Sequence, residues 1–381
     1  MQTADALIIG AGPAGTSCAM ALATRGRRVV LVDRSVFPRA KTCGGFIAPE
    51  SRKLLESMGV WNELLSQGAQ LVNKAVLSSA DGTAVTIPVH DGPALGVSRD
   101  LLDKVLLARA KALGVEVLEG ARIRQVIGDD KGFELDIDHY SRGTTRLLKV
   151  RDLISATGHP VTLPDAPGVQ MGIGALYEDI PALRGQVSLV CCRGGHVGIN
   201  PFELGKVNVC YVVEAGLFKA CGNDPQRVID AWTRENISLQ NILGKARRVT
   251  PWKAVCVPAR KAVVLNKDGI WRVGDAAAFI DPVTGGGMSV ALLSGQFLAG
   301  ALLAHDDEAS RLRQYARDYH TCFVWQRRVA ALWGGLAHHP LSARMVIGFL
   351  NDHAHFKSMG MRYSHPPSSL RMVGTKQEVY S

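Results

Sequence analysis

The sequence predicts an α/β fold in which a second, β-rich domain is interleaved into a Rossmann-type nucleotide-binding domain. Glycine-rich segments follow short apolar stretches near both ends of the 381-residue chain, at residues 10–15 and 274–287. Between them, at about residues 172–265, the pattern is typical of short strands. Either segment alone is a weak signal, but together they predict one extended cofactor held at both of its ends.

The first glycine-rich segment belongs to a predicted βαβ unit. Residues 5–9 and 29–33 are apolar runs typical of buried parallel strands, and residues 16–24 predict a helix of small side chains. The N-terminus of such a helix offers unpaired N–H groups and a partial positive charge to a pyrophosphate. The residues expected to contact the cofactor here are Gly10, Gly12, Pro13, Ala14 and Gly15.

The glycines and the acid of this unit have separate roles. Gly10 permits the tight turn, Gly12 lets the backbone approach the pyrophosphate, and Gly15 lets the helix and the strand pack closely. Asp33 ends the second strand, where a carboxylate accepts hydrogen bonds from an adenosine ribose. Arg34 follows, and we expect it to flank the adenine. This unit alone does not distinguish FAD from NAD.

The second glycine-rich segment favours a flavin. Asp275 follows a predicted strand at residues 269–273, where its carboxylate is suited to the hydroxyls of a ribityl chain. The loop at residues 282–287 then opens an apolar helix at residues 288–304. Its free N–H groups favour negative charge, which a reduced flavin carries on its pyrimidine side. The helix is at the short end for a membrane span, so we expect a buried core helix.

These motifs resemble those of the para-hydroxybenzoate hydroxylase-like FAD-dependent oxidoreductases, whose relatives include geranylgeranyl reductases and flavin-dependent halogenases. The similarity covers roughly residues 1–305 and implies the glutathione reductase-like form of the Rossmann domain. The segments that carry it are residues 41–45 (KTCGG), 97–103 (VSRDLLD), 198–201 (GINP) and 273–282 (VGDAAAFIDP). The KTCGG segment is similar to the reductase-like branch of the family.

The resemblance implies which further residues surround the cofactor and the substrate. The cofactor set is Cys43, Gly44, Arg99, Gly274, Asp275, Pro282, Gly285, Gly286, Gly287 and Met288, and the substrate set is Asn200, Pro201 and Phe202.

Three of the residues near the flavin have two interpretations each. Cys43 either acts beside the flavin ring or is a small apolar filler. Asn200 either binds a substrate oxygen or makes a turn before Pro201. Asp281 either polarises a group at the flavin edge or caps the following helix.

The same resemblance leaves the reaction open between classes. Our first expectation is a monooxygenase that hydroxylates a hydrophobic aromatic or polyketide-like molecule of secondary metabolism through a flavin C4a-hydroperoxide. The alternatives are a geranylgeranyl reductase-like enzyme that reduces alkenes of prenyl chains, and a flavin-binding protein without turnover. A halogenase is not expected, because no two of the six tryptophans are two residues apart as its Trp-x-Trp-x-Ile-Pro element requires.

The expected electron donor is NAD(P)H, used directly or through a partner flavin reductase. The sequence has no second Gly-x-Gly-x-x-Gly motif that would indicate a separate nicotinamide domain. The family's Gly-Ala-Asp-Gly element is replaced by residues 155–160 (SATGHP), which lack the aspartate. Direct docking of NADPH is therefore in doubt.

The domain boundaries follow the pattern of predicted elements. Residues 1–68, 96–160 and 266–330 are expected to form the FAD-binding domain, residues 69–95 and 161–265 the substrate domain, and residues 331–381 a basic helical segment. Helices are expected at residues 51–65, 101–113, 225–244 and 311–336, and a hairpin at 75–89 that turns at Asp81-Gly82. Four strands within residues 115–150 predict a small antiparallel extension, and prolines at 160, 164 and 167 a crossover.

Cysteine and histidine spacing predicts no metal site. None of the eight cysteines forms a Cys-x-x-Cys pair, and the late histidines (residues 338, 339, 353, 355 and 365) match no metal motif. Free thiols, and a first strand that starts within the first few residues, favour a cytoplasmic location.

The net charge is +10, and residues 311–381 contribute +7 of it, with ten Lys or Arg against three Asp or Glu. This basic region is either a solvated face or a site for NADPH, a partner or peripheral membrane contact. No nucleic-acid-binding module is present in the sequence.

Overall fold

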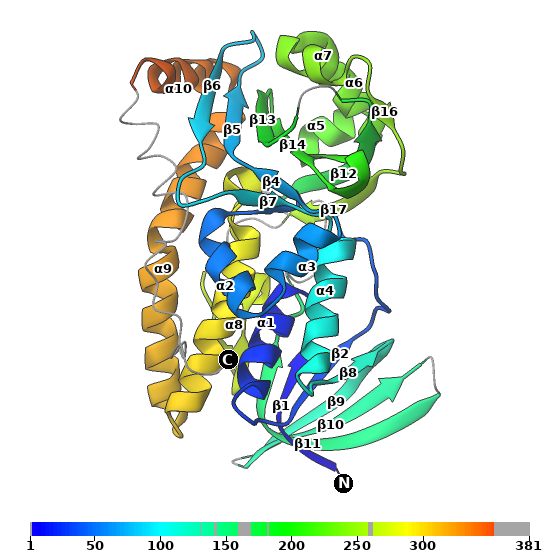
Figure 1. Cartoon of the computed structure of the whole chain (residues 1–381), viewed down its shortest axis with the longest axis vertical. Helices are drawn as coiled ribbons and strands as arrows, with labels where there is room; N and C mark the ends of the chain where they lie inside the picture. Colours follow the sequence, from blue (N-terminus) through cyan, green and yellow to red (C-terminus); the bar gives the residue numbers. More distant parts are fainter. Residues whose placement is uncertain are drawn as a thin grey trace.

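The computed structural model describes residues 2–129, 131–140, 143–158, 169–180, 183–257 and 262–353. Two predictions concern positions outside the described residues. These are the crossover at prolines 160, 164 and 167, and the histidines at 355 and 365. Figure 1 shows two sheet-centred regions, one above the other, with a long helix along one side.

The lower region is built on an open sheet with strand order β18-β19-β11-β1-β2-β8. Its bounds are β1 (Gln2–Ile9), β2 (Val29–Asp33), β8 (Glu116–Glu119), β11 (Thr144–Ser155), β18 (Asn266–Lys267) and β19 (Ile270–Arg272). β1 pairs in parallel with both β2 and β11, as the predicted βαβ unit requires. Helices α1 (Pro13–Ala23), α4 (Arg99–Ala112) and α8 (Gly287–Ala304) pack in one core with this sheet.

The antiparallel extension differs from the prediction in two ways. β9 (Ala121–Asp129) and β10 (Gly132–His139) do form it, together with the first half of β11. β8 instead pairs in parallel with β2 and belongs to the main sheet. The last strand predicted for the extension does not end near residue 150 but continues as one long strand, β11, which pairs with β10 in its first half and with β1 along most of its length. Partner choice of this kind depends on long-range packing, which sequence periodicity does not carry.

The upper region is a mostly antiparallel sheet with strand order β16-β12-β15-β14-β13-β5-β6, and β17 also pairs with β12. The bounds are β5 (Lys74–Ser78), β6 (Ala84–Pro88), β12 (Gln170–Glu178), β13 (Gln186–Cys192), β14 (Gly195–Pro201), β15 (Val207–Glu214), β16 (Arg247–Arg248) and β17 (Lys253–Val257). The predicted hairpin at residues 75–89 is confirmed as β5 and β6. A small sheet of β3 (Phe46–Ile47), β7 (Ala94–Gly96) and β4 (Gln70–Val72) lies between the two regions in Figure 1.

Helices α5 (Ala215–Ala220), α6 (Pro225–Glu235) and α7 (Ile237–Leu243) share a core with one face of the upper sheet. The single helix predicted at residues 225–244 is wrong, because Asn236 ends α6 and caps α7 by accepting a hydrogen bond from Leu239 N at 3.1 Å. The helix predicted at residues 51–65 is likewise two helices, α2 (Arg52–Ser57) and α3 (Trp61–Ser66), separated by Gly59 at φ +73°. A left-handed residue interrupts a helix wherever it occurs.

The long helix predicted at residues 311–336 is confirmed as α9 (Glu308–Ala337). It runs beside α8 and leads into α10 (Pro340–Asp352), which crosses the end of the β5–β6 hairpin (Figure 1). Among the described residues, α8 is the one helix long and apolar enough to cross a membrane, and 72% of it is buried in the protein. The expectation of a core helix is therefore confirmed.

Candidate flavin-binding site

Close packing of α1 against α8 brings the two glycine-rich segments together. A Cβ atom at Gly295 of α8 would lie 2.6 Å from Ala14 O and 2.9 Å from Cys18 N, so the two helices cross at near contact. Ser17 Oγ donates to Leu292 O at 2.7 Å and ties them further. At the end of β19, Gly274 has φ +59°, and a Cβ there would lie 2.9 Å from the Ala14 side chain. The N-terminus of α1 and the second segment therefore face one site, as the sequence predicts.

The first glycine-rich turn has the geometry expected of a dinucleotide site. Gly10 has φ +109°, and a Cβ there would lie 2.3 Å from Ala156 O. At Gly15, a Cβ would lie 1.9 Å from Gly10 O, so only glycine allows this helix-to-strand contact. Gly12 differs, because a Cβ there would meet only the Arg99 guanidinium at 3.4 Å and that of Arg39 at 3.8 Å. The backbone at Gly12 is therefore open toward two cations.

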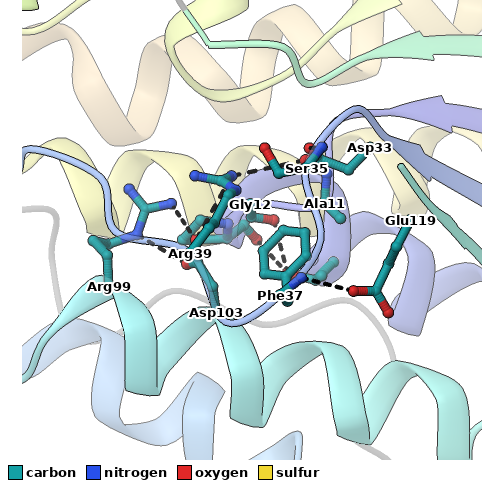
Figure 2. Close-up of polar contacts among 11 residues, drawn as sticks. Ala11, Gly12, Asp33, Ser35, Phe37, Arg39, Arg99, Asp103 and Glu119 are labelled. Atoms are coloured by element: carbon teal, nitrogen blue, oxygen red, sulfur yellow. Dashed lines mark hydrogen bonds and ion pairs between the residues drawn. The ribbon is translucent and has the colours of Figure 1, made fainter. Parts of the chain in front are cut away.

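These two cations share a buried carboxylate. Arg99 lies at the start of α4 and binds Asp103 through two hydrogen bonds of 2.9 and 2.7 Å, and both side chains are buried. Arg39 lies 3.7 Å from Asp103 and 3.7 Å from Asp33, and so bridges α4 and β2 (Figure 2). Burial alone would lower the pKa of Arg99, but the charge and hydrogen bonds of Asp103 raise it, so the guanidinium stays charged.

The segment that carries Arg39 is anchored to the sheet. Phe37 N donates to the carboxylate of Glu119, at the end of β8, at 2.8 Å, and the Arg39 guanidinium lies 4.8 Å from the Phe37 ring centroid (Figure 2). Arg39 was not among the residues predicted for the site. Its signal was the basic pair Arg39 and Lys41 immediately before Cys43.

Asp33 also stabilises the glycine turn itself. One carboxylate oxygen accepts from Ala11 N at 2.9 Å and the other from Ser35 N at 2.8 Å (Figure 2). The carboxylate therefore fixes the turn before any ribose binds, and its contact with a ribose stays a prediction. Arg34 is exposed beside it.

Lys41 connects the pyrophosphate side of the site to the second segment. Its ammonium lies 3.3 Å from the position of a Cβ at Gly158, at the end of β11. Loss of hydration and the charges of Arg99 and Arg39 lower the pKa of Lys41, while the Asp275 carboxylate raises it. Three cations therefore gather beside the α1 N-terminus, where a pyrophosphate would be stabilised.

The flavin-ring end is shaped by the loop at residues 281–287. Asp281 Oδ1 accepts from Val283 N at 3.1 Å and caps the short helix η4 (Pro282–Thr284), so the capping interpretation of Asp281 is confirmed. Gly285 has φ +69° and leaves room for the Phe46 ring, which a Cβ would approach to 2.8 Å. Gly287 has no atom within 4 Å of a Cβ position and is open, whereas Met288 is buried in the first turn of α8.

Helix α9 supports this loop from behind. The Gln326 carboxamide lies against Gly286, where a Cβ would come within 1.9 Å of Nε2. Gln326 is buried, and neither its oxygen nor its nitrogen has a hydrogen-bond partner among the described residues. At Gly334, a Cβ would lie 2.3 Å from Asp281 Oδ2, so α9 also packs on the start of the loop. No motif in the sequence indicated Gln326, because its position depends on how α9 docks.

A second loop faces this site from the substrate sheet. Asn208 Nδ2 donates to Cys43 O at 2.9 Å, and Asn200 Nδ2 donates to Gly44 O at 3.1 Å. Asn200 and Asn208 are paired neighbours on β14 and β15, so two adjacent strands hold two consecutive carbonyls. The turn interpretation of Asn200 is therefore wrong, because the residue lies within a strand.

Phe202 is buried against the same loop, and its contact with a substrate stays a prediction. Gly45 has φ +66°, and a Cβ there would lie 2.1 Å from the Phe202 ring. Pro201 ends β14 and is also buried. The predicted substrate residues thus surround the Cys43–Gly45 loop and fix its shape. Gly44 is open, with no atom within 4 Å of a Cβ position.

Three small, uncharged residues face this loop from adjacent strands of the sheet, beside Lys253 of β17, which pairs with Gly174. Ile173, Val209 and Tyr211 point toward helices α5–α7. Because successive side chains of a strand point to opposite faces, Gly174 and Cys210 face the loop. Across the sheet, Gly174 pairs with Cys210 and Cys210 with Gly198, and a Cβ at Gly174 would lie 3.5 Å from the Thr42 methyl group. Burial raises the pKa of Cys210 to about 12, so its thiol stays neutral. We name this strip, Gly174, Cys210 and Gly198, the small-residue row.

Among the described residues, no group of three histidine, cysteine or acidic side chains is placed to hold a metal ion. All eight cysteines carry free thiols. Of the histidines near the end of the sequence, His338 contacts the substrate sheet. Its ring stacks on that of His196, with the ring centroids 5.6 Å apart. Burial and the nearby His338 lower the pKa of His196 to about 3, so this pair is a packed, neutral contact.

Comparisons with known proteins identify the cofactor. Residues 3–176 match the family described as FAD binding domain. The chain is 24% identical over 366 residues to digeranylgeranylglycerophospholipid reductase 2 of Methanopyrus kandleri, which covers 89% of each chain. It is 27% identical over 353 residues to menaquinone reductase of Mycobacterium tuberculosis, covering 87% of this chain and 84% of that protein.

Among solved structures, the flavin-dependent brominase Bmp2 superposes with a TM-score of 0.81 at 18% identity and covers 95% of this chain and 93% of its own. At that identity the similarity concerns the fold alone. The predicted resemblance to the para-hydroxybenzoate hydroxylase-like flavoproteins, the fold class and the FAD cofactor are confirmed.

Proposed function

We propose that this chain, an FAD-dependent oxidoreductase of the para-hydroxybenzoate hydroxylase-like superfamily, reduces carbon–carbon double bonds in the isoprenoid part of a lipid. FAD would be held at its diphosphate by the α1 N-terminus with Arg39, Lys41 and Arg99, and in its reduced form it would supply a hydride to one alkene carbon, with the proton for the other carbon coming from solvent. The electron donor is NAD(P)H, used directly or through a partner flavin reductase.

The small-residue row is the observation that carries this proposal. Gly174, Cys210 and Gly198 form a strip without charged side chains, opposite the loop that is held by Asn200 and Asn208. An extended hydrocarbon needs length and apolar contact, and it offers no polar group for recognition. Replacing a row residue with a bulky one would block such a chain without touching the cofactor.

The relatives support the same reaction class. Both curated relatives reported above align over more than four-fifths of this chain, and both are named as reductases of isoprenoid lipids. The KTCGG segment that first suggested the reductase-like branch is the loop that Asn200 and Asn208 hold. Oxygen insertion, the first expectation from the sequence, is the rival reaction.

The test is an anaerobic single turnover of the FAD-loaded protein. The flavin is reduced chemically and mixed with a geranylgeranyl lipid in detergent, while its visible absorption band is followed. We expect the lipid to reoxidise the flavin without oxygen and to gain two hydrogen atoms by mass spectrometry. Free reduced FAD with the same lipid is the control for uncatalysed transfer.

Oxygen separates this proposal from its rival. If the flavin is reoxidised only after air is admitted, and an aromatic product gains one oxygen atom, the protein is a monooxygenase and the proposal is wrong. The Gly198→Leu variant provides a second check, because it should bind FAD normally and lose lipid reduction by at least about tenfold. Equal lipid reduction by that variant and the parent would show that the small-residue row does not bind the substrate.

A further inference from the structure

The end of α9 and the whole of α10 carry a group of exposed apolar side chains. Leu341, Met345 and Phe349 follow one another at intervals of four on α10, with exposed fractions of 76, 75 and 46%. On α9, Trp325 and Leu332 are 57 and 64% exposed. A second, smaller group of exposed apolar side chains lies on the β9–β11 extension, at Val126, Ile127 and Leu147. The concentration on two consecutive helices is larger, and a contiguous group of this kind is typical of an interaction surface. We name the five residues on α9 and α10 the apolar stripe.

The stripe is separate from the hydrophobic core, because each helix already packs against the core through its opposite face. Ala343, Ile347 and Leu350 of α10 pack with Val85 and Ile87 of β6 in one buried cluster. In α9, Ala330, Gly334 and Ala337 are buried. Each helix is therefore held to the protein on one side and presents apolar groups on the other.

Cations border the stripe. The Arg328 guanidinium lies 5.1 Å from the Trp325 ring centroid, and exposed Arg344 lies between Leu341 and Met345 in sequence and pairs with Asp81 at 3.0 Å. The sequence from residue 325 to residue 349 is basic, since it contains three arginines, at positions 327, 328 and 344, and no Asp or Glu. Tryptophan, phenylalanine and leucine beside arginine are typical of a helix that lies in the interface of an anionic bilayer.

We propose that the apolar stripe docks this protein on an anionic lipid membrane, with α10 lying flat in the headgroup region. α10 spans 13 residues, too few to cross a bilayer, and its buried face fixes it to the β5–β6 hairpin. Its apolar side chains enter the acyl boundary, while the basic residues contact lipid phosphates.

This placement connects the membrane to the flavin loop. Val283, in the loop at residues 281–287, belongs to the same buried cluster as Ile347 and Leu350 of α10. Packed side chains of one buried cluster therefore connect α10 to that loop. Docking through the stripe would hold the flavin end of the site close to the bilayer, from which an isoprenoid lipid would be taken. The docking itself does not depend on which reaction the flavin performs.

The experiment is vesicle co-sedimentation of the FAD-loaded full chain. Vesicles of phosphatidylcholine are compared with vesicles that also contain phosphatidylglycerol, at low and high salt. We expect binding that requires phosphatidylglycerol and weakens as salt rises. The combined variant Leu341→Ser, Met345→Ser and Phe349→Ser should lower the partition coefficient by at least about tenfold. A matched variant, Ile127→Ser with Leu147→Ser on the exposed β9–β11 extension, should bind as the parent does.

A second measurement reports contact with the acyl region directly. Brominated lipids should quench part of the tryptophan emission, and Trp325→Phe should reduce that quenching, because Trp61, Trp232 and Trp271 are buried and Trp252 and Trp333 are only partly exposed. The visible flavin spectrum and the unfolding midpoint of each variant show whether it is folded.

Failure to bind anionic vesicles, or equal binding by the α10 variant, overturns the proposal. A dimer that the α10 variant dissociates, without vesicle binding by the parent, would instead assign the stripe to a second copy of the chain. Lipid reduction in detergent tests the proposed reaction separately, so a failure of one proposal is not read as a failure of the other.

Discussion

The two ends of the flavin site are built by different physical means. At the pyrophosphate end, Arg39, Lys41 and Arg99 gather beside the N-terminus of α1, and a buried Asp103 holds two of them in place. At the ring end, side-chain amides hold the Cys43–Gly45 loop through hydrogen bonds. Glycines in that loop and in the loop at residues 281–287 leave room for neighbouring phenylalanine rings. One end is organised by charge and the other by shape.

Because of this difference, FAD affinity and catalytic turnover should depend on different ends of the site. Charged groups attract a diphosphate over several ångströms, and their effect depends on salt and pH. Uncharged amides and glycines act only at contact, and they determine where the ring and the substrate lie. We therefore expect changes at the first end to alter mainly FAD affinity and stability, and changes at the second to alter mainly turnover.

Gly12→Val should have the largest effect on FAD binding. Its methyl groups would enter the space beside the Arg99 guanidinium, which lies 3.4 Å from the Cβ position, where the pyrophosphate approaches the backbone. We expect the dissociation constant for FAD to rise at least about 100-fold, close to 2.7 kcal/mol. Titration of the apoprotein with FAD measures this. Gly216→Val, where a Cβ meets no atom within 4 Å, is the control and should bind FAD normally. Tight binding by Gly12→Val would place the diphosphate elsewhere.

Asp103→Asn should have the largest effect on the free energy of unfolding. The substitution leaves the buried Arg99 guanidinium without its carboxylate, and the loss of one partner of a buried ion pair costs about 3–5 kcal/mol. Urea denaturation of the apoprotein measures the change. Glu56→Gln removes the exposed pair with Arg52 and should cost less than about 1 kcal/mol. Similar losses in both variants would show that burial does not distinguish the two pairs.

Asn208→Ala tests the ring end. It removes the hydrogen bond to Cys43 O, and a neutral hydrogen bond of this kind contributes about 0.5–1.5 kcal/mol. We expect turnover of the loaded enzyme to fall by about threefold to tenfold, while the FAD dissociation constant changes by less than about threefold. Asn200→Ala should act in the same direction, because it releases Gly44 O. A larger loss of FAD affinity than of turnover would contradict the division between the two ends.

The smallest expected effect is the pH dependence of FAD affinity through Lys41. Its pKa is lowered, so the ammonium loses its charge at a lower pH than an ordinary lysine does. Because the charged form attracts the diphosphate, FAD affinity should fall as pH rises through that pKa, by a few-fold at most. Lys41→Met should bind FAD more weakly at neutral pH and show a flatter profile. An unchanged profile would exclude Lys41 from the phosphate site.

The sequence was sufficient to predict those parts of the structure that depend on residues close together in the chain. Glycines at positions 10, 12 and 15, between an apolar strand and a helix, predicted the turn at the start of α1 that the structure has. The apolar pattern predicted α8 and α9 and their order. Local signals were less reliable at helix interruptions, because Gly59 and Asn236 end helices that periodicity alone would continue.

Only the tertiary structure decided which distant residues meet. Arg39 and Asp103, Asn208 and Cys43, and Gln326 and Gly286 are each separated by at least 40 residues in the chain. Their contacts follow from the crossing of α1 and α8, the docking of α9 and the pairing of β14 with β15. The sequence by itself therefore determined the cofactor class and most of the elements, since backbone conformation and periodicity are encoded locally. The supports of the site depended on long-range packing, which no short stretch of sequence specifies.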